Sequence, residues 1–199
     1  TMFIVLITFM IERTLTINKA HGNGSMETFL QNVKNKLAGH DINGALAECT
    51  KQKGSVANVV QAGLHKYAEM EKNTDLTGEQ KLLNIQKEVE EATTLELPAL
   101  ESNLNIIATI ATVGTLVALL GTVLGMLRSF SALGQAGATD TSALAQGISE
   151  ALVNTALGIA TSAIAIIAYN YLTSKIDKLT YGIDEIGYSI AQSFASSKH

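Results

Sequence analysis

Two long apolar runs constrain this chain more than any other feature of its sequence. Residues 104–127 and 148–171 are 24 residues each, and Glu150 is the only Asp, Glu, Lys or Arg that they contain. About 20 apolar residues cross a bilayer core as a helix. Because lipid offers the backbone no hydrogen-bond partners, each run must form a closed helix. The sequence therefore predicts a membrane hairpin.

Both runs are rich in small and hydroxyl residues. Gly121 and Gly125 form a GxxxG motif in the first run, and Gly158 lies in the second. Small side chains allow membrane helices to approach closely, and Thr and Ser hydrogen-bond across the gap. We expect these three glycines to pack helices together. We also expect the hairpin to contact other helices rather than lipid on all sides.

Composition argues against several classes of protein. The net charge is −4, and no basic patch with interleaved aromatic residues is present, so we expect no nucleic-acid partner. The single cysteine, Cys49, permits no internal disulfide, and the four histidines lack metal-ligand spacing. No phosphate-binding loop, nucleophile elbow or zinc motif occurs. We therefore expect no enzyme activity, no cofactor and no metal site.

The distribution of charge predicts the orientation in the membrane. Residues 12–103 hold 10 of the 14 Lys and Arg, whereas residues 129–147 hold none. By the positive-inside rule the former are cytoplasmic and the latter lie outside. The expected order is the inner part of a truncated first transmembrane helix (1–11), a cytoplasmic helical domain (12–103), the second transmembrane helix (104–128), a periplasmic loop (129–147), the third transmembrane helix (148–172) and a cytoplasmic C-terminal helix (173–199). For residues 1–11, a signal-peptide core or a buried soluble helix are the alternatives.

Local signals predict helices throughout the polar segments. Ser25 and Asp41 are candidate N-caps, and Thr77 with Gln80 forms a capping-box pair. Pro98 is expected to kink or locally break its helix before the second span. In the C-terminal segment, apolar residues recur at the 4–3–4–3–4 spacing of a coiled coil: Leu172, Ile176, Leu179, Ile183, Ile186 and Ile190. The expected fold class is all-α, with long helices that extend into the cytoplasm.

Thr122 and Thr155 are the candidate functional residues inside the spans. Thr122 lies six residues before Arg128 and Thr155 five residues after Glu150, so in an antiparallel hairpin the two reach similar depths. They either line a path that holds water or passes a proton, or bond their own helix and hold helices together. Composition leaves both interpretations open.

Glu150 is the one carboxylate at the edge of a span. Its charge costs at least ~2.5 kcal/mol inside a membrane, which favours a functional role. The alternative is a near-surface residue in the first turn of its helix, favoured by the helix dipole and paired with Arg128. The middle of both spans lacks an ionisable side chain. If the protein moves protons, a carboxylate near the middle of the membrane must therefore come from another chain.

Two segments resemble a known family. The segments LVALLGTVLGMLRSF (116–130) and GISEALVNTALGIATS (147–162) are similar to the two signature segments of the MotA/TolQ/ExbB proton-channel family. The arrangement of one span, a cytoplasmic block and a hairpin resembles the ExbB/TolQ branch more than the flagellar stator subunit. Family members often have a proline where this chain has Ile164, which suggests a straighter third helix here.

The resemblance implies an assembly and a function. It implies a homo-oligomeric ring, typically a pentamer, in the bacterial inner membrane, around an ExbD/TolR-like dimer of single-span helices that supplies a membrane aspartate. Proton flow would then energise a TonB-like or TolA-like protein. On the matched positions, Thr122 and Thr155 would line the pore and Glu150 would stand at its outer end.

The sequence predicts an ExbB-like channel subunit for outer-membrane transport and leaves three alternatives. A TolQ-like subunit for envelope integrity has nearly the same sequence features. A relative of the flagellar stator subunit MotA should show a longer cytoplasmic insertion and a fourth span, and neither is visible. A non-conducting membrane scaffold would use the hairpin and the C-terminal helix only to assemble other proteins.

Overall fold

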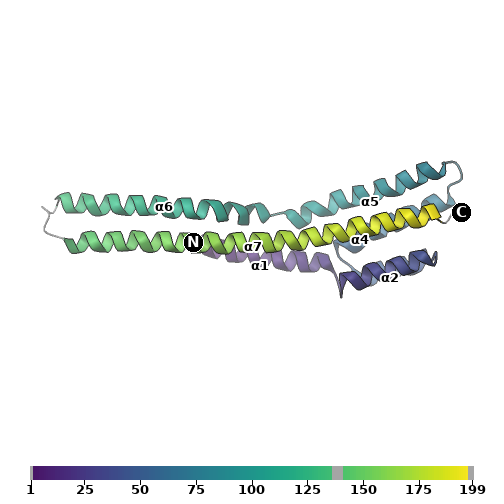
Figure 1. The fold of residues 1–199 in the computed structure, drawn as a ribbon, viewed down its shortest axis with the longest axis horizontal. Helices are drawn as coiled ribbons and strands as arrows, with labels where there is room; N and C mark the ends of the chain where they lie inside the picture. The colour runs from purple at the N-terminus through teal and green to yellow at the C-terminus, as the bar shows by residue number, and fades with distance from the viewer. Residues whose placement is uncertain (1, 136–140, 197–199) are drawn as a thin grey trace. The chain divides into compact units, whose positions relative to one another are not determined.

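The computed structural model describes residues 2–135 and 141–196, and every regular element in these ranges is a helix (Figure 1). This confirms the prediction of an all-α fold. The chain divides into two compact units: a hairpin unit (Thr1–Arg13, Asn103–Leu172) and a polar unit (Thr14–Ser102, Thr173–His199). The helices are α1 (Met2–His21), α2 (Met26–Ala38), α3 (Ile42–Gln52), α4 (Ser55–Lys72), α5 (Gly78–Glu101), α6 (Leu104–Gln135) and α7 (Thr141–Ser196).

The helices of the polar unit begin where the capping signals predict. The carboxylate of Asp41 accepts a hydrogen bond from the Gly44 amide at 2.8 Å, which caps α3. Thr77 and Gln80 form the complete capping box of α5. Ser25 precedes α2, as predicted, although its side chain makes no capping hydrogen bond. These caps satisfy amides that the first helical turn leaves without partners.

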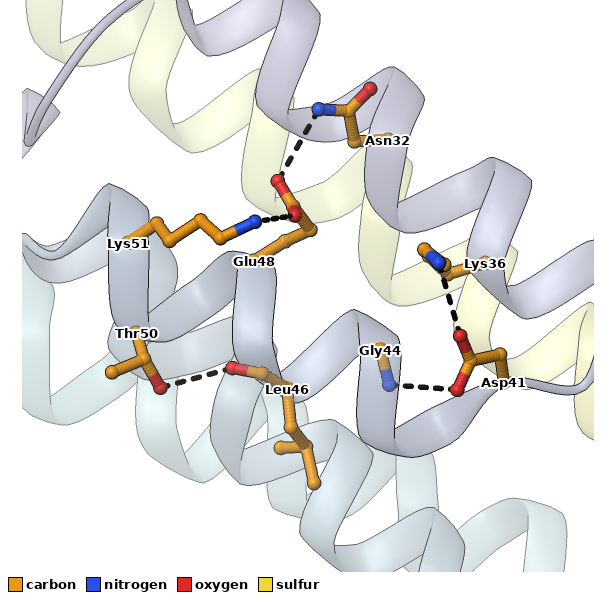
Figure 2. Close-up of polar contacts among 8 residues, drawn as sticks. All are labelled: Asn32, Lys36, Asp41, Gly44, Leu46, Glu48, Thr50 and Lys51. Atoms are coloured by element: carbon orange, nitrogen blue, oxygen red, sulfur yellow. Dashed lines mark hydrogen bonds and ion pairs between the residues drawn. The ribbon is translucent and has the colours of Figure 1, made fainter.

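Figure 2 shows the polar contacts between α2 and α3. Glu48 accepts hydrogen bonds from Lys51 and Asn32, and Asp41 also pairs with Lys36. The Gly44 amide, followed by Lys36, lowers the pKa of Asp41. The hydrogen bond from Lys51 lowers the pKa of Glu48. Both carboxylates are therefore fully charged at neutral pH, and these contacts organise the surface of this helix pair.

Cys49 lies on the inner face of α3 and is 2% exposed. Burial raises the pKa of its thiol to about 12, because the protein interior disfavours the thiolate. The thiol is therefore protonated at neutral pH and is a poor nucleophile. Cys49 therefore acts as a small apolar side chain in the interior of the polar unit.

The break before the second span does not lie at Pro98. Helix α5 continues through Pro98 to Glu101, and the Ser102 amide bonds the Pro98 carbonyl at 3.0 Å. The break occurs at Ser102 and Asn103, where Asn103 has a φ of 60°. Proline removes one hydrogen bond on its N-terminal side but leaves the following turn free to close. Asparagine tolerates the left-handed conformation, so the chain turns there instead.

Helices continue beyond the apolar runs, while the predicted membrane boundaries at residues 11, 128 and 148 stay predictions. The described parts of the predicted loop 129–147 are helical, since α6 continues to Gln135 and α7 begins at Thr141. Residues 136–140 of that loop lie outside the described residues. Helix α1 likewise continues past residue 11 to His21. Hydrophobicity determines which part of a helix lies in the membrane, whereas the residue at which the helix ends depends on helix propensity and capping.

The apolar spacing of the C-terminal segment is confirmed, and it packs within this chain. Five of its residues belong to the polar unit and are at most 3% exposed: Ile176, Leu179, Ile183, Ile186 and Ile190. The rings of Tyr67 and Phe194 meet edge to face at 5.0 Å. Ser193 donates a hydrogen bond to the Leu37 carbonyl at 3.2 Å. This half of α7 therefore packs against α2 and α4 within the polar unit.

Two helical stretches among the described residues are long and apolar enough to cross a membrane, Gly78–Gly134 and Leu144–Ser196. Only 22% and 28% of their most apolar windows are buried within the chain. A water-soluble protein rarely exposes so continuous an apolar surface. The hairpin unit therefore needs lipid or other helices around it. Whether α1 is the inner part of a third span stays a prediction.

Candidate functional site

Helices α6 and α7 pack against each other in the hairpin unit through very small side chains. A Cβ atom added to Gly158 would lie 2.1 Å from the Ala118 Cβ, and one added to Gly125 would lie 3.0 Å from the Ala151 Cβ. Ala118 and Ala151 are 9% and 2% exposed. In lipid, burial of apolar surface does not drive two helices together. Close packing of the two backbones stabilises the contact instead.

The three glycines expected to pack helices therefore differ. Gly125 and Gly158 lie in the α6–α7 contact, whereas a Cβ atom on Gly121 would have no atom within 4 Å. The contact residues of α6 follow the positions 118, 122, 125 and 129, at 4–3–4 spacing. Gly121 lies beside that row. Within one chain, Gly125 is thus the glycine of the GxxxG motif that lies in the α6–α7 contact.

This difference predicts the effect of two matched substitutions. Gly158→Ala is expected to destabilise the α6–α7 hairpin by about 1–3 kcal/mol, because its methyl group overpacks the contact with Ala118. Gly121→Ala should leave hairpin stability within ~0.5 kcal/mol. Reversible unfolding of the purified chain in mixed micelles measures both. Equal losses for the two variants would contradict the packing described here.

Thr122 and Thr155 face each other across the α6–α7 contact, and their hydroxyl groups are in direct contact. The Thr122 hydroxyl also lies 3.1 Å from the Ala118 carbonyl and 3.3 Å from the Ala151 carbonyl. The Thr155 hydroxyl lies 3.4 Å and 3.5 Å from the Ala151 and Ala118 carbonyls. The expectation of similar depth is confirmed. Two hydroxyls and two carbonyls form one cluster of four oxygen atoms, called the threonine cluster below.

The threonine cluster fits both interpretations of these residues. Each hydroxyl bonds its own helix and the opposite one, as helix-packing threonines do. Both side chains are nevertheless only half-buried, so one side of the cluster is open. A hydroxyl has one proton to donate and two lone pairs, and four acceptors compete for two protons here. The cluster can therefore rearrange its hydrogen bonds when a new polar group arrives.

The hydroxyl groups of the hairpin form separate layers along the α6–α7 contact. Ser129 donates to the Gly125 carbonyl at 2.9 Å, seven residues from Thr122. Ser162 lies seven residues from Thr155, and seven residues of helix span ~10.5 Å. A hydrogen bond spans ~3 Å, so these layers do not make a continuous relay. A proton path past the threonine cluster needs water or a group from outside the contact.

Ser162 is a polar residue that sequence reasoning did not single out. It is 4% exposed, and its hydroxyl has no hydrogen-bond partner. A Cβ atom added to Gly114 would lie 2.6 Å from its oxygen, so the glycine makes room for it. The pairing of Ser162 with Gly114 needed the register of the two helices, which the sequence does not show.

Glu150 is exposed at the start of the predicted third span. Its carboxylate accepts a hydrogen bond from Gln146, one turn earlier on α7, at 3.3 Å. Arg128 is exposed as well, and among the described residues no ion pair joins it to Glu150. The pairing with Arg128, part of the near-surface alternative, is therefore not made within the described part of the chain. Glu150 is available to a partner or to solvent.

The described residues hold no group of His, Cys, Asp and Glu that could bind a metal ion. Residues 104–127 and 151–171 contain no carboxylate. Threonine can bind and orient a proton carrier, but it does not titrate at accessible pH. The site can thus receive a titrating group without supplying one.

Comparisons with known proteins agree with this arrangement. Residues 51–185 match the MotA/TolQ/ExbB proton channel family. The chain is 42% identical to the biopolymer transport protein ExbB of Aquifex aeolicus over 39% of this chain and 52% of that protein. It is 35% identical to the Tol-Pal system protein TolQ of Haemophilus influenzae over 52% of this chain and 48% of that protein. The TolQ protein of Pseudomonas aeruginosa is 27% identical over 72% of this chain and 61% of that protein.

These matches span about half the length of the curated relatives. The match to the family covers more than half of this chain and includes the Thr122 and Thr155 segments. The named relatives are ExbB and TolQ proteins, in agreement with the branch that the resemblance favours. The chain belongs to the MotA/TolQ/ExbB proton channel family.

Proposed function

We propose that this chain is the channel-forming subunit of an ExbB-like complex that uses the proton-motive force to energise a TonB-like protein. The observation that carries the proposal is the threonine cluster: two facing hydroxyls, open on one side, between two spans whose middle lacks an ionisable side chain. Such a site can serve a carboxylate that another chain inserts beside it. The protein would act as a non-enzymatic motor subunit without a cofactor.

The cluster can serve both protonation states of that carboxylate. A deprotonated carboxylate accepts hydrogen bonds, which the Thr122 and Thr155 hydroxyls can donate. A protonated carboxyl group donates, and the Ala118 and Ala151 carbonyls or a hydroxyl oxygen can accept. The charged form costs at least ~2.5 kcal/mol in the membrane, so donors at this depth lower the barrier to releasing the proton. Glu150, toward the outer end, would attract protons to the path.

The proposed assembly is a homo-oligomeric ring of five copies, as the family resemblance implies, around an ExbD/TolR-like dimer of single-span helices. The low burial of the apolar windows supports this, because the exposed surface must contact lipid or neighbouring helices. We place the ring in the bacterial inner membrane with the polar unit in the cytoplasm. The excess of Lys and Arg in residues 12–103 supports that orientation.

A TolQ-like role is the second candidate, because TolQ proteins match more of this chain than the ExbB protein of Aquifex aeolicus does. Expression in strains that lack either protein separates the roles. Restored growth on ferric siderophores supports the ExbB-like role, and restored resistance to detergents supports the TolQ-like role. A flagellar-stator role has no supporting observation in the structure.

The channel proposal predicts that the chain alone is nearly proton-tight. Reconstituted in liposomes under a pH gradient, it is expected to leak little above protein-free vesicles, because the middle of its spans lacks a titrating group. Adding an ExbD/TolR-like partner should raise the flux well above this baseline. The measurement is the fluorescence of a pH dye inside the vesicles. Strong flux without any partner would contradict the proposal that another chain supplies the titrating carboxylate.

A further inference from the structure

The hairpin unit contains a second layer of hydroxyl groups beside the threonine cluster. Seven residues closer to the end of the spans that we place in the cytoplasm, Thr115 takes the place of Thr122 on α6, and Ser162 takes the place of Thr155 on α7. Seven residues make almost two complete helical turns, so each position returns to nearly the same helix face. We call Thr115 and Ser162 the inner hydroxyl layer.

The register of α6 and α7 brings the two residues of this layer to the same level of the hairpin. The two helices run side by side (Figure 1), and a Cβ atom added to Gly114, the residue before Thr115, would lie 2.6 Å from the Ser162 hydroxyl oxygen. Ser162 thus points across the contact toward α6. Thr115 is half-buried, as Thr122 and Thr155 are, so the layer is open on the side of Thr115.

The Ser162 hydroxyl is the group in this layer that needs a partner. Ser162 is 4% exposed, and no described residue forms a hydrogen bond with its hydroxyl. The neighbouring Thr161 is also buried, but it donates to the Leu157 carbonyl, one turn back, at 2.8 Å. A Ser162 hydroxyl that only packed would bond the Gly158 carbonyl in the same way. Because an unpaired buried hydroxyl is costly, its orientation toward α6 points to a polar group from outside the chain.

The distance between the two hydroxyl layers fits a short chain of water molecules. Seven residues of helix span ~10.5 Å, which is about four hydrogen-bond lengths. Between the layers, residues 116–121 of α6 carry no hydroxyl group, and on α7 the Thr161 hydroxyl already bonds its own helix. Water in an apolar passage needs about two to four polar partners to be held. The inner hydroxyl layer is the next level toward the cytoplasm at which side chains offer them.

We propose that Thr115 and Ser162 are positioning residues that hold the water through which the partner's carboxyl group releases its proton toward the cytoplasm. The O–H bond of the carboxyl group breaks as a bond to the nearest water oxygen forms, and each water passes one proton to the next until bulk water receives it. The carboxylate left behind keeps the hydrogen bonds that Thr122 and Thr155 donate. The inference rests on the proposed function and adds to it the exit that the threonine cluster alone lacks.

The test is partner-dependent proton flux in liposomes, compared with hairpin stability in mixed micelles. Ser162→Ala combined with Thr115→Val is expected to lower the flux at least about tenfold. Ser162→Ala alone should lower the flux while hairpin stability stays equal or rises, because the change removes an unpaired buried polar group. A residue that only held the two helices together would lower both quantities when it is removed.

Two matched variants separate the hydroxyl of Ser162 from other effects of substitution. Thr161→Val removes the neighbouring hydroxyl, which already bonds its own helix, and should leave the flux unchanged. The exchange variant Gly114→Ser, Ser162→Gly returns one hydroxyl to the same layer from the opposite helix. It should restore most of the flux that Ser162→Ala loses.

Three results would overturn the inference: normal flux in the Ser162→Ala, Thr115→Val variant, an equal loss in Thr161→Val, or no recovery in an exchange variant that folds. If the double variant does not fold, Ser162→Ala alone must still lower the flux. Failure of the proposed function gives a different result, because wild type would then show no flux with its partner. Normal wild-type flux that these variants leave intact would remove this inference only.

Discussion

Thr155→Val is expected to abolish most proton-driven work while the hairpin still folds and the ring still assembles. Valine keeps the shape of threonine but cannot donate to a carboxylate. A hydrogen bond to a charged group contributes about 1.5–3 kcal/mol, so its loss should slow proton transfer about 10- to 150-fold. Replacing Thr122 as well should remove the remaining donor. The measurement is partner-dependent proton flux in liposomes, together with growth on ferric siderophores.

Controls decide whether a loss of flux reports on the hydroxyl. Thr155→Ser restores a donor at the same position and should recover much of the flux. Interhelical hydrogen bonds in membranes average about 0.6 kcal/mol, so hairpin stability in mixed micelles should change little in either variant. If a Thr122→Val, Thr155→Val double variant keeps normal flux, the two hydroxyls only pack helices and the scaffold interpretation gains support.

Features that depend on neighbouring residues in one helix or one hairpin could be predicted from the sequence alone. The capping box at Thr77 depends on two residues that are three positions apart. The similar depths of Thr122 and Thr155 follow from the rise of each helix, counted from Arg128 and from Glu150. The apolar spacing of α7 likewise identified residues that are buried. In each case one helix, or one hairpin, contains all the information that the prediction needs.

Features that depend on helix register or on competing packing were not predictable in this way. Gly121 and Gly125 have the same motif in sequence, but only the register of α6 against α7 shows that Gly125 is in the contact. The pairing of Ser162 with Gly114 has the same origin. The break at Asn103 rather than at Pro98 reflects which residue tolerates the left-handed conformation. Helix α6 continues to Gln135, beyond its apolar run, because a helix continues wherever propensity allows.

Ile183→Asp is expected to unfold the polar unit, and loss of ring assembly should follow from that unfolding. Ile183 is 1% exposed, at the centre of the apolar row of α7 that the chain's own helices cover. A carboxylate there would be buried without a partner, and such changes are among the most destabilising single substitutions, often above about 4 kcal/mol. A typical domain has only about 5–15 kcal/mol in total. The polar unit should therefore become sensitive to protease.

Tyr181→Asp is the matched control, because Tyr181 lies two residues away on α7 and is 70% exposed. It introduces the same charge into the same helix but leaves the apolar row intact, so the polar unit should stay resistant. Limited proteolysis and native mass spectrometry of the full chain give the two readouts. If Ile183→Asp stayed protease-resistant and lost only its oligomeric state, the row would be a contact between copies. Its burial within one chain predicts the opposite order, in which folding fails first and assembly fails as a consequence.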